Sequence, residues 1–429
     1  MAVTSVELKY GSERWSLSCD EAQLLTVDLP SAERPEVLVR RALANPVGTP
    51  PLAEICQPGD RVVIVTSDIT RATGSALYLP ILVDELNRAG VDDRDIEIVI
   101  ALGIHRRQTA DEHRRIVGAL FGRIKVTDHD CDDAEQLVEL GCTSGGIPVW
   151  INRTVAEADR VIVTGSIGFH YFAGFGGGRK GLVPGVASRQ TCMASHFSVF
   201  NPPENGGKHP RAVAGALQGN PVHQNLLEAA KMVHSDFLLN TVLSPSKDML
   251  GVFCGDLVQA HLAGCELVRQ SYEVPLEEPV DLAVVSCGGL PKDINFIQAQ
   301  KALDYSVNAV RDGGVVILLA ACPDGFGHPT FFNWFRYQQL DAFEAALRAG
   351  YQINGQTAYS VFSKARRFKV LLVSELSRDQ TEAMGMKKAM DLSQAMEMAR
   401  KYLPVRPEIV IIPEGGTVLP RVVRSELRR

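Results

Sequence analysis

Short runs of apolar residues alternate with longer amphipathic stretches along the whole chain. RVVIVTSD at 61–68 predicts a buried strand that ends in a polar loop, and LYLPILVDELNRAG after it predicts a helix closed by glycine. Strand-like runs recur in DIEIVIALGIH, ADRVIVTGSIGFH, VDLAVVSCGG, GGVVILLAAC and FKVLLVS. Strands separated by helices of this length predict an α/β fold with mixed or parallel sheets flanked by helices.

The length of 429 residues predicts two domains. An acidic, proline-containing stretch, SYEVPLEEPVDLAVV, separates a predicted N-terminal domain at 1–272 from a C-terminal α/β domain at 278–404. The last segment contains RPEIVIIPEGG, and we expect 407–429 to complete the N-terminal domain as a strand. The active site is then expected in the crevice between the two domains.

Three polar side chains lie just beyond the carboxyl ends of predicted strands: Asp68, His105 and His170. Ligands of such sheets bind at these strand ends, so the three residues indicate one site. A lone histidine is usually a structural group with satisfied hydrogen bonds. Two histidines facing one substrate can instead act as alternate general base and acid, which suits a reaction that inverts a stereocentre.

The glycine-rich stretch GFGGGRKG at 174–181 allows two interpretations. It is either a cradle in which backbone N–H groups bind a phosphate, or simply a turn. It is not a Walker A loop, because Lys180 is followed by glycine, and its spacing is not that of a dinucleotide fingerprint. Lys180 itself is either a solvated surface lysine or a covalent anchor that reacts once it is deprotonated.

His196 follows Cys192 by four residues on a predicted helix, which places both on one face. The cysteine is interpreted as a small packing residue of the helix, whereas an imidazole is a good ligand for nickel, zinc or copper. One histidine cannot hold a metal alone, so other donors are needed.

Two further pairs are candidates for ligand contact. In SDITRAT, Asp68 and Arg71 are either a helix cap with a surface arginine or a pair in which Arg71 binds a carboxylate through two hydrogen bonds. Gln298 and Lys301 lie three apart in NFIQAQKA, hence on one helix face, for which a solvated face is the default interpretation.

Composition narrows the class of protein. The net charge of −6 gives no general attraction to nucleic acid or to an acidic membrane surface. No apolar run approaches the roughly 20 residues that cross a bilayer, and the first residues lack the pattern of a signal peptide. Nine scattered cysteines without a Cys-x-x-Cys pair argue against disulfides and thiolate zinc sites, so we expect a cytoplasmic protein. The residues alone indicate a two-domain α/β enzyme that acts on a small anion.

The motifs together resemble the nickel-pincer lactate racemase family of 2-hydroxy acid racemases and epimerases. The resemblance covers nearly the whole chain and rests on SDITR, ALGIHR, GFHYFAGFGGGRKGLVPG, the SH pair at 195–196 and NFIQAQK. The block HYFAGFGGGRK with a histidine sixteen residues beyond its lysine is the most specific part.

The resemblance implies a cofactor, pyridinium-3,5-bisthiocarboxylic acid mononucleotide, a nickel-pincer nucleotide bound by the N-terminal domain. It implies a thioamide link to Lys180, a nickel ligand at His196, and alternate proton acceptor and donor roles for His105 and His170. It also implies cofactor or substrate contacts from Asp68, Ile69, Thr70, Arg71, Gln298 and Lys301.

The implied reaction inverts C2 of a lactate-like 2-hydroxy acid. One histidine removes the hydroxyl proton as the hydride leaves C2. The 2-oxo acid reorients, regains the hydride on its other face and is protonated by the opposite histidine. Lys301 and Arg71 would neutralise the carboxylate and polarise the carbonyl. The enzymes that build the cofactor would be transient partners.

Two rival functions remain open from the sequence. One is a nicotinamide-dependent 2-hydroxy acid dehydrogenase, against which the missing dinucleotide fingerprint counts. The other is a non-catalytic protein that binds a nucleotide or nickel. Substrate choice is also open, with Phe296, Ile297, Tyr359 and Phe362 as plausible pocket-lining residues. The pair Arg106–Arg107 either receives a second carboxylate or faces solvent, and we favour solvent.

Overall fold

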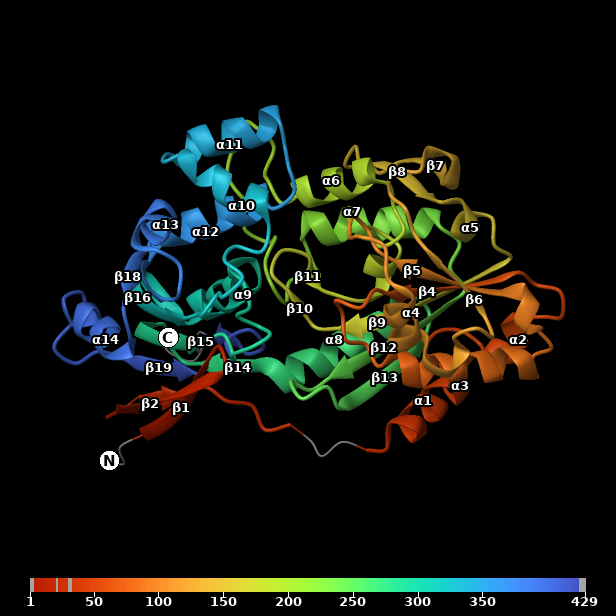
Figure 1. Ribbon diagram of the computed structural model, residues 1–429, viewed down its shortest axis with the longest axis horizontal. Coiled ribbons are helices and arrows are strands. Elements are labelled where there is room, and N and C mark those ends of the chain that lie inside the picture. Colours follow the sequence, from red (N-terminus) through yellow and green to blue (C-terminus); the bar gives the residue numbers. More distant parts are fainter. Residues whose placement is uncertain (1–3, 21, 30–32, 424–429) are drawn as a thin grey trace, which may run out of the picture. The chain divides into compact units, whose positions relative to one another are not determined.

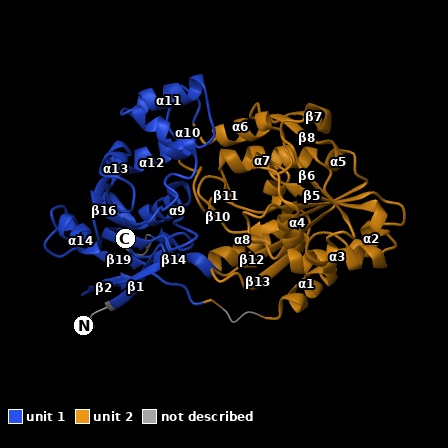
Figure 2. Cartoon of the chain, viewed as in Figure 1, with its two compact units in different colours: residues 1–28, 201–208, 271–429 blue, residues 29–200, 209–270 orange. Residues whose placement is uncertain are grey.

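The computed structural model describes residues 4–20, 22–29 and 33–423 (Figure 1). The chain forms two compact units, each assembled from segments that are separated in the sequence (Figure 2). Unit 1 comprises residues 1–28, 201–208 and 271–429, and unit 2 comprises residues 29–200 and 209–270.

Unit 2 is built on a six-stranded mixed sheet in the order β13-β12-β9-β4-β5-β6. Its strands are β4 (Val62–Ser67), β5 (Ile96–Ala101), β6 (Lys125–Asp128), β9 (Arg160–Ile167), β12 (Phe237–Leu243) and β13 (Met249–Gly255). Neighbouring strands are parallel except β12 and β13. The central strands β4 and β9 are almost entirely buried and rich in valine and isoleucine, as expected for strands covered on both faces.

Helices and short hairpins surround this sheet. The helices are α1 (Pro35–Ala44), α2 (Leu52–Ile55), α3 (Ser75–Arg88), α4 (Ala110–Val117), α5 (Arg153–Ala156), α6 (Arg189–Phe197), α7 (Pro221–Met232) and α8 (Gln259–Tyr272). The hairpins are β7 (Leu137–Cys142) with β8 (Pro148–Asn152) and β10 (Phe169–His170) with β11 (Gly174–Phe175). One core cluster joins α1 and α3 to the sheet face that carries Ile64, Ile98 and Ile162.

Unit 1 contains a six-stranded parallel sheet in the order β18-β17-β16-β15-β19-β3. Its strands are β3 (Gln23–Leu24), β15 (Val280–Ser286), β16 (Val310–Leu319), β17 (Lys369–Val373), β18 (Lys387–Ala389) and β19 (Ile409–Ile412). Its helices are α9 (Phe296–Ser306), α10 (Pro329–Asn333), α11 (Leu340–Ala349), α12 (Gly355–Arg367), α13 (Arg378–Ala383) and α14 (Leu392–Arg400). The remaining strands are β1 (Thr4–Tyr10), β2 (Glu13–Cys19), β14 (Glu273–Leu276) and β20 (Leu419–Val422).

Both sheets confirm the predicted α/β class, but the units differ from the expected domains. The segment 407–429 was expected to complete the N-terminal domain, yet β19 pairs with β15 and β20 pairs with β14, all in unit 1. Strand β15 is buried along its whole length, so it needs a partner on each side, and the apolar IVII of β19 supplies one. Residues 424–429 lie outside the described residues.

The first residues of the chain also belong to unit 1 rather than to the expected 1–272 domain. β3 pairs with β19 at the edge of the unit 1 sheet. The segment 201–208 joins unit 1 as well, because the Gly207 N–H donates to Glu344 (2.6 Å) and Arg348 donates to the Asn201 carbonyl (2.8 Å). The main division at 270/271 falls close to the expected position.

Within the described ranges, the helices lack the combination of length and apolar character that a membrane crossing requires.

Candidate functional site

Three predicted site residues follow strands that are neighbours in the unit 2 sheet. Asp68 directly follows β4, while His105 and His170 lie in the segments after β5 and β9. β4 lies between β5 and β9, and the carboxyl ends of parallel strands meet at the same edge. From β4 the chain first builds the sheet outward through β5 and later places β9 on the other side of β4. The loops therefore lie at a switch point, where ligand crevices form in such sheets.

The Asp68 carboxylate is buried and contacts His105. His105 Nδ1 lies 2.5 Å from Asp68 Oδ2, and the Thr70 hydroxyl donates to Asp68 Oδ1 at 2.6 Å. Burial by itself would raise the pKa of Asp68, but the hydrogen bonds from His105 and Thr70 and the charge of Arg71 outweigh it and lower the pKa. Asp68 is therefore an ionised partner that orients His105, whose ring is 44% exposed.

Gln108 joins the loop of His105 to the loop of Asp68. Its Oε1 accepts from the Ile69 N–H (3.2 Å), and its own N–H donates to Asp128 (2.7 Å). Asp128 is in turn 2.7 Å from His113 Nε2. These hydrogen bonds between the two loops were not predicted from the sequence. The strand-end rule applied to β6 would have selected Asp128, but no sequence pattern marks Gln108.

The two arginines after His105 are paired with acidic residues. Arg106 makes two hydrogen bonds to Glu112 (2.8 and 2.7 Å), and Arg107 donates to Asp130 at 2.9 Å. Both arginines are exposed. This arrangement agrees with the solvent-facing interpretation of the pair.

His170 lies in the short hairpin β10–β11. The Ala173 N–H donates to its Nδ1 at 3.2 Å. The neighbouring Phe172 ring contacts His170 edge-on, with centroids 4.5 Å apart, and also meets the His196 ring at 5.3 Å. Lys180 Nζ is 6.0 Å from the same Phe172 centroid. The buried Phe172 thus lies next to His170, His196 and the predicted anchor Lys180.

The glycine run before Lys180 is required by internal packing. Gly177 has φ +68°, and a Cβ there would lie 2.5 Å from Asn240 Oδ1. Gly178 has φ +53°, and its Cβ would lie 2.7 Å from the His261 ring. The Gly178 N–H donates to the same Asn240 oxygen (2.7 Å). These two glycines therefore form a tight turn, for which no ligand needs to be invoked, and that turn presents Lys180.

Lys180 is surrounded by positive charge and little water. Burial, together with the charges of Arg179 and Arg71, lowers the pKa of Lys180 to about 7. Arg179 is 1% exposed, and its Nη2 donates to the Ala173 carbonyl at 2.7 Å. A substantial fraction of Lys180 is therefore an uncharged amine near neutral pH, the form that acts as a nucleophile.

His196 is held as a neutral ring on α6. Its Nδ1 lies 2.8 Å from the Cys192 carbonyl, so Nδ1 carries the hydrogen and Nε2 keeps its lone pair. Burial and the charge of Lys180 lower the pKa of His196 to about 4. Burial raises the pKa of Cys192 to about 12, which keeps that side chain a thiol. The described residues contain no cluster of three His, Cys, Asp or Glu side chains placed to hold a metal ion.

Gln298 and Lys301 lie on α9 of unit 1, whereas the other predicted site residues lie in unit 2. Lys301 Nζ donates to Gln298 Oε1 at 2.7 Å, as their spacing on one helix face predicts. Phe296 and Phe362 are fully buried in unit 1 and Tyr359 is 5% exposed, so these three are core residues. Ile297 is only partly buried.

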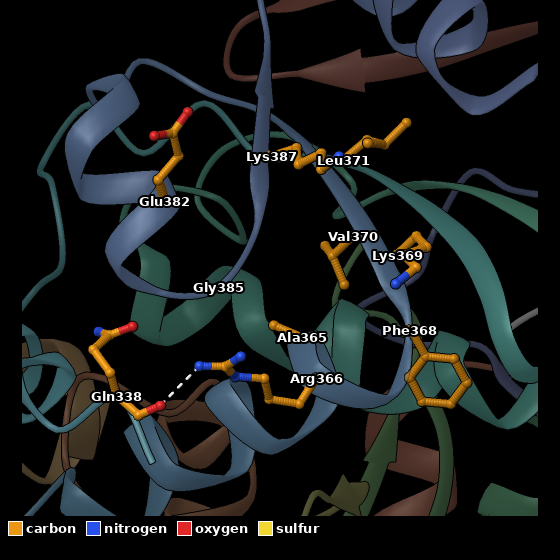
Figure 3. A pocket seen from close by; sticks show the side chains of 10 residues that line it. All are labelled: Gln338, Ala365, Arg366, Phe368, Lys369, Val370, Leu371, Glu382, Gly385 and Lys387. Atoms are coloured by element: carbon orange, nitrogen blue, oxygen red, sulfur yellow. Dashed lines mark hydrogen bonds between the residues drawn. The ribbon is translucent and has the colours of Figure 1, made fainter. Parts of the chain in front are cut away.

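A separate cavity of about 360 Å³ lies in unit 1 (Figure 3). Lys369 and Lys387, at the amino ends of β17 and β18, line it together with Arg366 and Glu382. Ligands of parallel sheets bind at the opposite, carboxyl ends. None of the predicted site residues lines this cavity.

Comparison with known proteins gives a consistent result over most of the chain. The family model for the lactate racemase N-terminal domain matches residues 10–207, and that for the lactate racemase C-terminal domain matches residues 276–420. The lactate racemase of Thermoanaerobacterium thermosaccharolyticum is 32% identical over 98% of this chain and 100% of its own length. That of Lactiplantibacillus plantarum is 32% identical over 89% of this chain and 90% of its own length.

Solved structures give the same picture. The lactate racemase apoprotein from Thermoanaerobacterium thermosaccharolyticum superposes with a TM-score of 0.88 at 32% identity, covering 97% of this chain and 100% of that chain. A structural-genomics protein from Thermotoga maritima has a TM-score of 0.66 at 19% identity, covering 93% of this chain and all of its own, which supports the fold alone.

Proposed function

Because the chain belongs to the lactate racemase family, we propose that it is an isomerase that inverts C2 of a lactate-like 2-hydroxy acid. The observation that carries this proposal is the cluster around Phe172. It joins His170, His196 and the amine of Lys180 within one unit, while Asp68 orients His105 in an adjacent loop.

The residues present fit the nickel-pincer nucleotide that the family resemblance implies. Lys180 has the uncharged amine that a covalent attachment requires, and the turn of Gly177 and Gly178 holds it in place. His196 has the tautomer of a nickel ligand, with Nε2 available and Nδ1 fixed by a carbonyl. When bound, the cofactor supplies a hydride acceptor that also returns the hydride.

The chain's own residues would bind the substrate and move its protons. Arg71 has an exposed guanidinium suited to bidentate binding of the substrate carboxylate. Lys301, whose Nζ donates to Gln298 Oε1, would contact the substrate, as the family resemblance implies. His105 and His170 would exchange the hydroxyl proton. The loop from Asp68 through Ile69 and Thr70 would contact the cofactor, a role that is compatible with Asp68 also orienting His105.

The test is to produce the protein together with the cofactor-building enzymes, then measure Lys180 by peptide mass spectrometry, nickel per chain, and interconversion of enantiomers of 2-hydroxy acids. We expect a mass increment on Lys180, one nickel and racemisation. Lys180→Arg keeps a long basic side chain but removes the reactive amine, and should lose all three. Lys231→Arg, on the exposed surface of α7, is the matched control.

Three results would contradict the proposal. Racemisation with Lys180 unmodified would refute the attachment. Modified, nickel-loaded protein that leaves the C2 hydrogen of every 2-hydroxy acid unexchanged would refute the racemase. A substrate-dependent change in NADH absorbance would favour the dehydrogenase.

A further inference from the structure

The two candidate acid–base histidines have different partners at Nδ1. In His105, Nδ1 faces the carboxylate of Asp68 at 2.5 Å. Asp68 is 2% exposed and already accepts a hydrogen bond from Thr70 at its other oxygen, and it is ionised, so it can only accept from the ring. Nδ1 of His105 therefore carries a hydrogen, and in the neutral ring Nε2 keeps its lone pair.

In His170 the same nitrogen faces a donor instead of an acceptor. The Ala173 N–H points at Nδ1 from 3.2 Å, and a backbone N–H can only donate. The Phe172–Ala173 peptide that carries this N–H is itself fixed, because its carbonyl accepts from Asn220 Nδ2 at 2.9 Å and Ala173 is fully buried. Nδ1 of His170 therefore keeps its lone pair, and in the neutral ring the hydrogen is on Nε2.

We propose that the two histidines rest in opposite tautomers, with His105 set as the proton acceptor and His170 as the hydrogen-bond donor to the substrate oxygen. Asp68 and the Ala173 peptide act as the positioning groups that impose this difference. The consequence for turnover rests on the proposed racemase function, but the tautomers themselves do not.

The asymmetry makes proton movement in the proposed reaction unequal at the two rings. A hydroxyl that faces His105 gives its proton to Nε2, and the ring becomes an imidazolium beside Asp68. The C2 hydrogen would leave with its electron pair as a hydride to the acceptor that the bound cofactor supplies. Nothing has to rearrange at His105. The proton that this ring gained later returns to solvent.

His170 must rearrange before it can complete the inversion. When the reoriented oxygen takes the Nε2 hydrogen of His170, the ring stays neutral only if Nδ1 gains a proton from solvent, which breaks the hydrogen bond from Ala173. The reverse reaction needs the same Nδ1-protonated form of His170 at its start. One proton enters from solvent and one leaves in each inversion, and the hydride that left C2 returns to it, so protons and electrons both balance.

Nuclear magnetic resonance of the full-length protein, made without cofactor and labelled with 15N at histidine, tests the proposal directly. Multiple-bond 1H–15N spectra at mildly alkaline pH identify which ring nitrogen carries the hydrogen. His105→Gln and His170→Gln assign the two rings by loss of their signals. We expect hydrogen on Nδ1 of His105 and on Nε2 of His170.

Rates cannot replace this measurement. Because enantiomers have equal free energies, kcat/KM is the same in both directions for every variant. The effect of variants at Asp68 and Ala173 on the two tautomers must therefore be measured in the 15N spectra of the histidine rings. In Asp68→Asn the amide N–H₂ can donate to Nδ1 of His105, so the ring hydrogen should move to Nε2 and the 15N shifts of the two ring nitrogens should exchange. The spectrum of His170 should stay unchanged.

Ala173→Pro removes the N–H donor. It should abolish the preference of His170 for hydrogen on Nε2 and leave the tautomer of His105 unchanged. Ala173→Gly keeps the donor and is its control. Finding both rings in the same tautomer, or His170 with hydrogen on Nδ1, would overturn the proposal. If the proline variant does not fold, the wild-type and Asp68→Asn spectra still show which nitrogen of each ring carries the hydrogen. Because no cofactor is present, a protein that fails to racemise leaves this result intact.

Discussion

Replacing Lys180 with methionine should stabilise the protein made without its cofactor. The pKa of Lys180 is lowered from its ordinary 10.5 to about 7, mainly because the amine loses water on burial and also because Arg179 and Arg71 are close. Folding therefore disfavours the charged form of this side chain. Methionine has a similar length and carries no charge, so it removes that cost.

The size of the expected stabilisation follows from the difference between the ordinary pKa of lysine, 10.5, and the lowered pKa of Lys180, about 7. This difference corresponds to about 5 kcal/mol of free energy between the charged and uncharged forms, which is an upper bound. Because the Lys180 side chain retains partial contact with solvent, we discount this to roughly 2 kcal/mol. Between pH 7 and pH 10.5 the unfolded chain binds a proton here that the folded chain has lost, so wild-type stability rises with pH across that window. The advantage of Lys180→Met is therefore fully present below pH 7 and disappears as pH approaches 10.5.

The assay is urea-dependent amide hydrogen exchange of peptides from β4 and β9, because these central strands report the opening of unit 2. Wild type and variant are compared at several pH values from 6 to about 11. Lys231→Met, at an exposed position on α7, is the control and should show no such pH-dependent difference. An advantage of Lys180→Met that stays constant across the window, or that grows with pH, would refute the reasoning.

Three further changes have defined outcomes. Asp68→Asn should lower racemisation by about 10²- to 10⁴-fold, because His105 loses the carboxylate that orients it; a chiral assay that finds wild-type rates would contradict this. His196→Ala should remove nickel from the loaded protein, measured by elemental analysis, whereas His234→Ala at an 81% exposed side chain should retain it; equal nickel contents would argue against the assigned ligand. Glu344→Gln should speed amide exchange in 201–208 by roughly ten- to a hundredfold, because a charged acceptor of a backbone N–H is lost; unchanged protection would show that this carboxylate does not hold the segment.

The predicted strands and their polar ends were accessible from the sequence because buried parallel strands leave a simple signal. Val62–Ser67 and Arg160–Ile167 each contain a short run of valine and isoleucine, and the residues after the two strands fall at one sheet edge by geometry. For this reason Asp68 and His170 could be selected before the structure was known.

Features that depend on side-chain packing could not be predicted in this way. The pairing of His105 with Asp68 joins loops 37 residues apart, and nothing in either loop specifies the other. The burial of Arg179 contradicts the usual exposure of arginine and depends on the Ala173 carbonyl. Membership of 201–208 in unit 1 was hidden because this polar segment has no apolar pattern, and its attachment is a hydrogen bond to Glu344.

The three-part construction of unit 1 limits how the gene can be divided or recombined. A fragment beginning at residue 271 would lack β3, which borders β19 at the sheet edge, and would lack the segment that Glu344 and Arg348 hold. It would expose an unpaired strand edge, which favours aggregation over autonomous folding, and Glu344 would lose the Gly207 N–H that it accepts in the full chain. Chimeras that exchange this unit between relatives therefore need three coordinated transplants, from the beginning, the middle and the end of the polypeptide.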